Sequence, residues 1–195
     1  MNLSELQPIT KYGVTLRPLT HDKIEMVRQW RTDPKISQYM EYRGEITPEM
    51  QERWFLKINA SGTDFYFIIE TAGKEIGLIN VKDVEWDKKT GETGIFIWDD
   101  DCLNSDYGVR SALAIHDFCF ETLQLDYLHG HTLGDNKRAN RLNKALGYTI
   151  APNQEDVLNK EFYLYKDNYT KKTAPIRALL EKQYSKLKLS ICKKP

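Results

Sequence analysis

The chain has 195 residues, of which 41% are hydrophobic and 11% aromatic, enough apolar material for one domain with a buried core. Its 28 lysines and arginines balance its 28 aspartates and glutamates, so the formal net charge is zero. A dedicated nucleic-acid-binding protein normally carries a basic excess, so the composition argues against that class and leaves room only for a local basic patch.

The N-terminal part of the chain contains a predicted strand and two predicted helices. Residues 1–13 are a lead-in, and the alternating segment 14–18 is the strand. The first helix covers 23–31 and ends at Asp33-Pro34, because proline disfavours helical geometry in the residue before it. The second helix covers 47–58, since its opening Thr-Pro-Glu supplies a capping side chain followed by proline at the first helical position.

Three β-rich segments follow and are joined by short turns. They cover 65–71, 76–84 and 92–98, and the turns between them contain Gly73 and Gly91. Such short connections predict an antiparallel meander.

The second half of the chain alternates between helical and extended patterns. We expect a helix over 108–123, a strand over 125–133, a helix over 136–146, a strand over 161–166 and a lysine-rich helix over 175–189. The apolar stripe of this last helix comprises Ile176, Leu179, Leu180, Tyr184 and Leu187. The stripe can pack on its own domain or on a second copy, so a monomer and a homodimer both stay open.

Together these elements predict a mixed α/β (α+β) fold, in which helices flank one mostly antiparallel central sheet and an extra helix ends the chain. The predicted divisions are a lead-in at 1–13, the domain at 14–166 and a tail with the amphipathic helix at 167–195.

The cysteines and the N-terminal residues indicate the cellular compartment in which the protein is expected. Cys102, Cys119 and Cys192 are odd in number and irregularly spaced, and none lies in a CxxC motif, so we expect buried or incidental thiols in a reducing compartment. The first thirteen residues lack the apolar core of a signal peptide, and no apolar run approaches the length of a membrane span. We therefore expect a soluble cytoplasmic protein that binds neither membranes nor nucleic acids.

Five stretches carry a resemblance to a known family. They are LRPLTHDKIEMVRQWRTDP, ITPEMQERWF, FYFIIETAGKEIGLINV, ETGIFIW and DNKRANRLNKALGY. Over roughly residues 14–165 the chain resembles the GNAT-superfamily N-acetyltransferases. Within that superfamily it looks most like the PseH-like branch, which acetylates amino groups on nucleotide-linked deoxysugars, and after that like the RimJ/RimL type. The resemblance implies a GNAT-like fold with acetyl-CoA as cosubstrate and no metal.

The resemblance also implies where acetyl-CoA binds. Its pyrophosphate should lie where the loop at 104–108 enters the next helix, because free backbone N–H groups and the helix dipole attract anions there. Family members place two glycines in this loop; Gly108 matches the second, and Asp106 replaces the first. Leu103 stands where the family prefers Gln or Arg, and Arg110 can contribute positive charge.

The pantetheine arm should add like a short strand beside 95–97, where the strands 92–98 and 125–133 are expected to splay apart. The full set of implied cofactor-binding residues is Ile95, Phe96, Ile97, Leu103, Asn104, Ser105, Asp106, Tyr107, Gly108, Val109, Arg110, Asn136, Arg138, Ala139 and Asn143.

Four residues are candidates for the chemistry. By the resemblance, His131 stands where the sugar-acetylating relatives carry a glutamate that acts as the base. A histidine titrates near neutrality and can do the same work. Glu92 lies on the central strand, where many relatives place a base, and Asn80 on the neighbouring strand can hold a water molecule. Asn143 replaces the tyrosine that commonly protonates the leaving thiolate. Asparagine can only donate a hydrogen bond there, so water is an alternative proton source.

The first helices should form the acceptor side, with Arg31, Tyr39, Tyr42 and Trp54 as candidates. Arginine pairs with a phosphate, and the aromatic rings stack on a base or sugar. We expect an acetyl-CoA-dependent N-acetyltransferase that acts on a small amine, in particular an amino-deoxysugar nucleotide. Two alternatives are a RimJ/RimL-like protein N-terminal acetyltransferase and a non-catalytic acyl-CoA-binding or interaction protein on the same scaffold.

Overall fold

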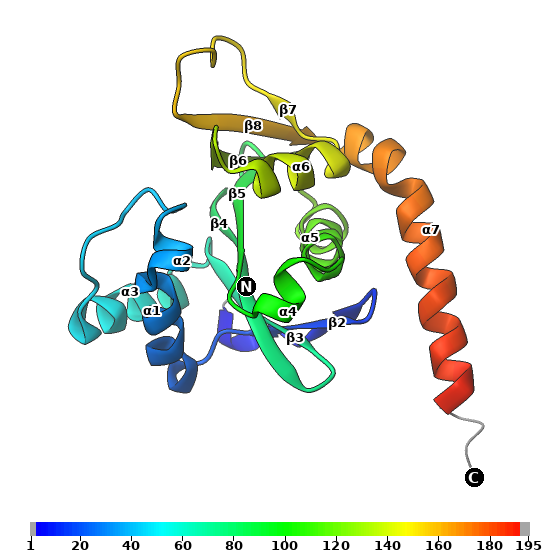
Figure 1. The fold of residues 1–195 in the computed structure, drawn as a ribbon, viewed down its shortest axis with the longest axis horizontal. Helices are drawn as coiled ribbons and strands as arrows, with labels where there is room; N and C mark the ends of the chain where they lie inside the picture. Colours follow the sequence, from blue (N-terminus) through cyan, green and yellow to red (C-terminus); the bar gives the residue numbers. More distant parts are fainter. Residues whose placement is uncertain (1–2, 192–195) are drawn as a thin grey trace.

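In the computed structural model, which describes residues 3–191, eight strands form one sheet in the order β1-β2-β3-β4-β5-β6-β8-β7 (Figure 1). The strands are β1 Ile9–Lys11, β2 Val14–Pro18, β3 Phe65–Thr71, β4 Lys74–Glu85, β5 Thr90–Ile97, β6 Tyr127–Leu133, β7 Thr149–Ile150 and β8 Asn159–Tyr165. Neighbouring strands are antiparallel except β5 and β6, which are parallel. The predicted mostly antiparallel sheet is confirmed.

Helices cover both faces of the sheet. They are α1 Ile24–Thr32, α2 Pro34–Ser37, α3 Pro48–Ser61, α4 Asp100–Leu103, α5 Tyr107–Asp117, α6 Lys137–Leu146 and α7 Lys166–Ile191, with short turns of helix at Leu3–Glu5, His21–Lys23 and Phe118–Thr122. Helices α1, α2 and α3 lie on one side of the sheet, and α5 and α6 lie on the other (Figure 1). None of the helices described is long and apolar enough to cross a membrane.

Side chains along the central strands point alternately to the two faces of the sheet, which explains why helices cover both faces. In β3, Phe65, Phe67 and Ile69 belong to the apolar cluster under α5, whereas Tyr66 and Ile68 belong to the cluster under α1 to α3. Successive side chains of a strand point to opposite faces, so an apolar run such as FYFIIET needs a helical layer on each side. We call these two sides the α5 side and the α1–α3 side.

The predicted start of α3 at Thr47-Pro48 is confirmed, whereas a helix start at Asp33-Pro34 was not predicted, and both starts have a local cause. The Asp33 side chain accepts a hydrogen bond from the backbone N–H of Lys35, and the Thr47 side chain accepts one from Met50. Helix α3 ends at Gly62, whose φ of 65° is left-handed and therefore favours glycine.

The β5–β6 register matters most for function. Only three pairs join these strands, Thr90 with Tyr127, Gly91 with Leu128 and Glu92 with His129. Both strands continue beyond the last pair, to Ile97 and Leu133, but β5 then pairs only with β4 and β6 only with β8. The expected splay between the two strands therefore begins directly after Glu92.

The chain ends contain more regular structure than the sequence predicted. Strand β1 lies inside the segment taken as a lead-in, and β7 was not predicted. Helix α7 begins at Lys166 rather than at Pro175, which lies inside it. Pro175 predicted a helix start at that residue, but tertiary packing extends the helix toward the N-terminus, because the buried Tyr169 anchors its first turns on the core.

Only part of the apolar stripe predicted for the last helix packs against the core. Leu180 is buried and Ile176 packs against the core, whereas Leu179 is exposed. The side chains of Tyr184 and Leu187 lie outside the described residues. Cys102 and Cys119 are buried free thiols, and Cys192 is also outside the described part.

Candidate active site

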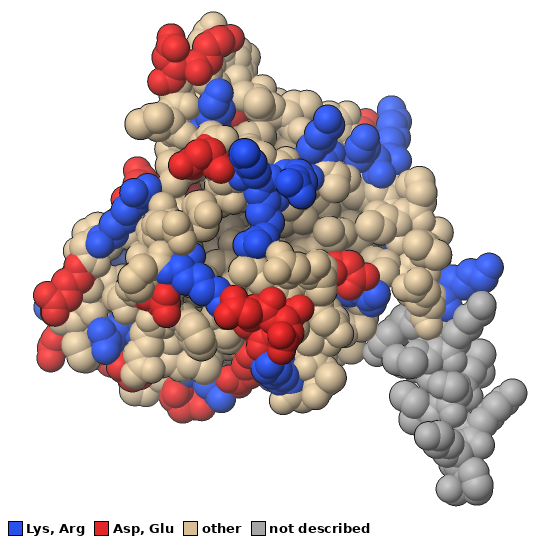
Figure 2. All heavy atoms as spheres, viewed as in Figure 1, with Lys and Arg blue, Asp and Glu red and all other residues tan. Residues whose placement is uncertain are grey.

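A cavity of about 1080 Å³ opens where β5 and β6 separate. Its lining includes Gly94 and Ile95 of β5, Gly130 and Thr132 of β6, and residues from α1 to α3 as well as α5 and α6. Lysine and arginine side chains gather beside a hollow in the face shown in Figure 2. Because the gap interrupts the sheet, one cavity reaches both of its sides.

Side chains of β5 divide between the two sides. Ile95 and Ile97 pack in the cluster under α5, whereas Phe96 packs in the cluster under α1 to α3. By the same alternation Thr93 faces the α5 side and Glu92 faces the α1–α3 side. Two neighbouring residues at the splay thus serve opposite halves of the cavity.

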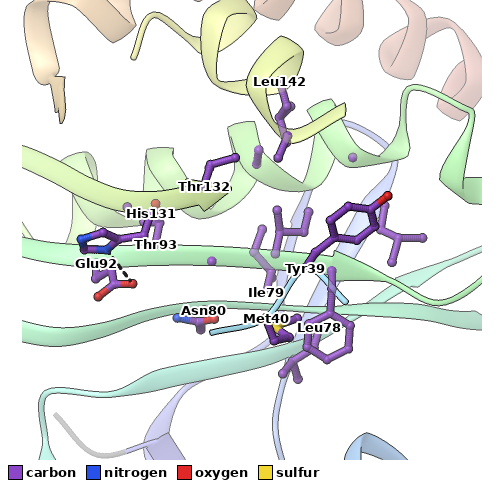
Figure 3. A pocket seen from close by; sticks show the side chains of 18 of the residues that line it. Tyr39, Met40, Leu78, Ile79, Asn80, Glu92, Thr93, His131, Thr132 and Leu142 are labelled. Carbon is purple, nitrogen blue, oxygen red and sulfur yellow. Dashed lines mark ion pairs between the residues drawn. The ribbon is translucent and has the colours of Figure 1, made fainter. Parts of the chain in front are cut away.

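Glu92 and His131 lie together on the α1–α3 side (Figure 3). The Nδ1 atom of His131 is 3.5 Å from Oε1 of Glu92, and the Lys82 ammonium is 3.1 Å from Oε2. Burial alone would lower the pKa of Lys82, but the charge of Glu92 and its hydrogen bond outweigh this and leave that pKa raised. Lys82 therefore stays cationic and holds the carboxylate of Glu92 in an ion pair. A carboxylate beside Nδ1 also favours the proton there, which leaves Nε2 of His131 with the lone pair.

Asn80 lines the cavity beside this pair (Figure 3). Its Nδ2 atom is buried without a hydrogen-bond partner among the described residues. A Cβ atom at Gly94 would lie 3.0 Å from Oδ1 of Asn80, so glycine leaves room for this amide. An amide nitrogen that faces the cavity without a protein partner fits the predicted role of holding a water molecule.

The row of asparagines on α6 does not act as one polar surface. Asn143 lines the cavity and donates to Oγ1 of Thr132 at 3.1 Å. Asn136 also lines it, but its side chain caps α6 by accepting from the N–H of Ala139. Asn140 does not take part, because its amide is bonded to backbone carbonyls at the β6–α6 turn, including that of Leu133.

In the loop before α5, the carboxylate of Asp106 is paired with a neighbouring side chain, beside the place where the pyrophosphate is predicted to bind. The Asp106 side chain does not line the cavity and instead accepts a 2.7 Å hydrogen bond from Arg110. Arg110 also donates to the carbonyl of Tyr12 at 2.9 Å, so it is an internal partner rather than a free cation. The i,i+4 spacing of Asp106 and Arg110 was the signal that could have predicted this pair.

Most of the implied cofactor-binding residues line the cavity: Ile95, Phe96, Ile97, Leu103, Ser105, Gly108, Val109, Asn136, Arg138, Ala139 and Asn143. Asn104, Asp106, Tyr107 and Arg110 are not part of this lining. Arg138 donates to Oδ1 of Asn104 at 3.1 Å, and Arg141 adds a second positive charge from α6. Contact of these residues with a cofactor stays a prediction.

All four predicted acceptor-side residues, Arg31, Tyr39, Tyr42 and Trp54, line the same cavity. The Nε atom of Arg31 is buried without a partner in the described structure. Trp54 meets the ring of Tyr66 edge-on at 5.0 Å, which holds its indole in place.

A buried polar chain on the α5 side was not predicted. The hydroxyl of Tyr148 lies 2.7 Å from Oγ1 of Thr93 and 3.0 Å from Nε2 of His116. Burial lowers the pKa of His116 to about 3 and raises the pKa of the Tyr148 hydroxyl, so both groups stay neutral. The three residues come from β5, α5 and the turn after α6, so no local pattern reveals their contact.

Replacing Tyr148 with phenylalanine is expected to lower the free energy of unfolding by about 1–3 kcal/mol, because half-buried Thr93 and buried His116 each lose a partner. Urea denaturation measures the change. Phenylalanine at the exposed Tyr165 is the matched control and should change stability by less than about 0.5 kcal/mol. Equal effects of the two substitutions would contradict the role of the buried chain.

The comparisons with known proteins agree with this geometry. A family model described as an acetyltransferase (GNAT) domain matches residues 14–149. Acetyltransferase PseH of Campylobacter jejuni is 26% identical over 140 residues, which cover 71% of this chain and 84% of the relative. A solved structure of spermidine N-acetyltransferase from Vibrio cholerae, in complex with CoA and spermine, matches with a TM-score of 0.72 and 19% identity over 80% of this chain and 98% of that one. The structure of Campylobacter jejuni N-acetyltransferase PseH matches with a TM-score of 0.60 and 22% identity over 79% and 99%. At these identities the solved structures show a shared fold.

Proposed function

Because this chain belongs to the GNAT acetyltransferase family, we propose that it transfers the acetyl group of acetyl-CoA to a primary amine on a small anionic molecule, namely an amino-deoxysugar nucleotide. The observation that carries the proposal is the gap after Glu92, which joins a carrier half and an acceptor half of one cavity.

The carrier half is the α5 side. Beyond Glu92 the edge of β5 that faces β6 has unpaired backbone groups, which suit an extended ligand that adds like a strand. Arg138 and Arg141 contribute positive charge to this half from α6. Acetyl-CoA supplies the activated acyl carbon and a thiolate leaving group.

The acceptor half performs the proton chemistry. An amine is an ammonium ion at neutral pH and must lose a proton before its lone pair can attack. The Nε2 atom of His131 accepts that proton directly or through a water molecule held by Asn80, and Glu92 stabilises the resulting imidazolium. Holding amine and acyl carbon together supplies most of the acceleration.

One cation of the acceptor half, Arg31, supports an anionic acceptor. The basic residues of the lining are Arg31, Lys35, Lys57, Lys82, Arg138 and Arg141, and the acidic ones are Glu41, Asp64, Asp83 and Glu92. The excess comes from Arg138 and Arg141 of the carrier half, so the acceptor half holds four residues of each sign. The Nε atom of Arg31 has no hydrogen-bond partner among the described residues, and its guanidinium can offer a phosphate a fork of N–H donors.

Release of free CoA thiol tests the proposal. The panel consists of amino-deoxysugar nucleotides, the same sugars without nucleotide, spermidine and ribosomal N-terminal peptides. The nucleotide-linked sugars should have the highest kcat/KM. Faster turnover of spermidine or of the peptides would overturn the proposed acceptor class.

Replacing Arg31 with methionine is expected to raise KM for the nucleotide-linked acceptor roughly 10- to 100-fold and to change kcat far less, because a charged hydrogen bond to phosphate is lost. Steady-state kinetics with the nucleotide-linked sugar and with the unlinked sugar test the cause. The KM for the unlinked sugar should change little, because it has no phosphate for Arg31 to bind. Arg17→Met is the matched control, because Arg17 is exposed and paired with Glu70. An unchanged KM in Arg31→Met would refute the phosphate contact.

A further inference from the structure

We propose that Glu92, His129 and His131 form a binding site for one zinc ion at the edge of the acceptor half, and that zinc bound there inhibits acetyl transfer. The binding claim stands on the geometry alone, and the inhibition rests on the proposed function.

Strand register brings the three side chains together. His129 and His131 are two apart on β6 and so point to the same face of the sheet, and Glu92 of β5 is the register partner of His129. One ligand atom from each lies within 4.8 Å of the others. A tetrahedral zinc ion with ligands at about 2.1 Å needs them roughly 3.4 Å apart, which small side-chain rotations provide.

The ligand chemistry suits zinc. Two neutral imidazoles and one carboxylate leave one coordination position for water or another ligand. The Nδ1 atom of His129 is buried and has no hydrogen-bond partner among the residues described. The rings of His129 and His131 are perpendicular, with centroids 6.4 Å apart, so neither ring blocks the other.

Lys82 limits how tightly the site can bind. Its ammonium contacts Oε2 of Glu92, whereas Oε1 faces His131, so the carboxylate can bind a metal through Oε1 while it keeps its lysine. The fixed positive charge nearby opposes a divalent cation. The site should therefore exchange zinc readily, which suits regulation better than permanent structure.

Zinc at this position would remove the base. Coordination uses the imidazole lone pair of His131, so this residue can no longer accept a proton from the acceptor amine. Zinc does not displace acetyl-CoA, because the groove expected for acetyl-CoA lies on the opposite side of β5. Residues of β5, α5 and α6 line that groove. Inhibition should lower kcat and leave the affinity for acetyl-CoA unchanged.

Zinc affinity is measured by competition with a chromogenic chelator, with Zn²⁺ alone as the probe. Cys192→Ser serves as the parent chain, because this thiol lies outside the described residues and could bind zinc. The parent should bind one Zn²⁺, and Glu92→Gln, His129→Ala and His131→Ala should each weaken binding at least tenfold. Lys82→Met should strengthen it severalfold, a change opposite in sign that unfolding cannot produce. His21→Ala, which removes an exposed histidine paired with Glu52, should leave affinity unchanged.

The outcomes separate the two claims. No zinc binding by the parent at about 100 µM, or equal affinity in the parent and His131→Ala, overturns the site whether or not the protein acetylates any amine. Zinc binding as expected with unchanged acetyl transfer at saturating zinc overturns the inhibition. Absorption bands of tetrahedral Co²⁺ that disappear in His131→Ala support the ligand set independently of activity.

Discussion

Substitution of His131 by alanine is expected to lower kcat about 100-fold and to change the affinity for acetyl-CoA little, because the acceptor amine then has no base to take its proton. His131 lines the cavity on the α1–α3 side, whereas the expected carrier groove is on the α5 side. Steady-state thiol release gives kcat, and calorimetry gives the affinity for acetyl-CoA.

Two further substitutions at the same position test the chemistry rather than the shape. His131→Gln fills the space and cannot accept a proton, so it should be as slow as His131→Ala. His131→Glu restores a base, and its repulsion with Glu92 raises the pKa of the pair, so it should regain part of the activity. His21→Ala is the surface control and should keep full activity.

Particular results would contradict the assignment. If His131→Ala and His21→Ala have equal kcat, His131 is not the base. If Glu92→Gln is slower than His131→Ala, Glu92 rather than His131 takes the proton. In that case the ion pair with Lys82 must open during turnover, because it occupies the carboxylate that would accept the proton.

Local patterns explain why much of the fold could be predicted. The caps at Asp33 and Thr47 bond to backbone groups two and three residues away, so the sequence contains everything that determines them. The buried strand 65–71 was evident because apolar side chains occupy both of its faces. By contrast, the splay after Glu92 depends on register with a distant strand, and only the family resemblance predicted it.

The parts of the site that escaped prediction join distant segments. Thr93, His116 and Tyr148 meet across three elements, and each alone is typical of an ordinary core. Likewise, Glu92 and His129 come together only through the parallel pairing of β5 and β6, so local sequence patterns do not reveal their proximity.

Substitution of Asp117 by alanine is expected to lower the free energy of unfolding by about 3–5 kcal/mol, because it leaves buried partners without their carboxylate. Asp117 is only 2% exposed and accepts hydrogen bonds of 2.6 Å from both Tyr12 and Tyr169. It is also ion-paired with Lys11 of β1 and with Arg177 of α7. This one carboxylate therefore joins both ends of the described chain to α5.

Glu121 provides a control matched in charge. It pairs with the same two cations, Lys11 and Arg177, at 3.2 and 3.1 Å, but its side chain is 55% exposed. Water screens such a pair, so Glu121→Gln should cost less than about 1 kcal/mol. Urea denaturation compares the variants, and hydrogen exchange should show the amides of α7 opening first in Asp117→Ala. Similar losses in the two variants would mean that the charges, and not the buried hydrogen bonds of Asp117, hold α7 on the domain. The large difference expected here follows from the burial of Asp117 and its two tyrosine hydrogen bonds, since both carboxylates face the same lysine and arginine.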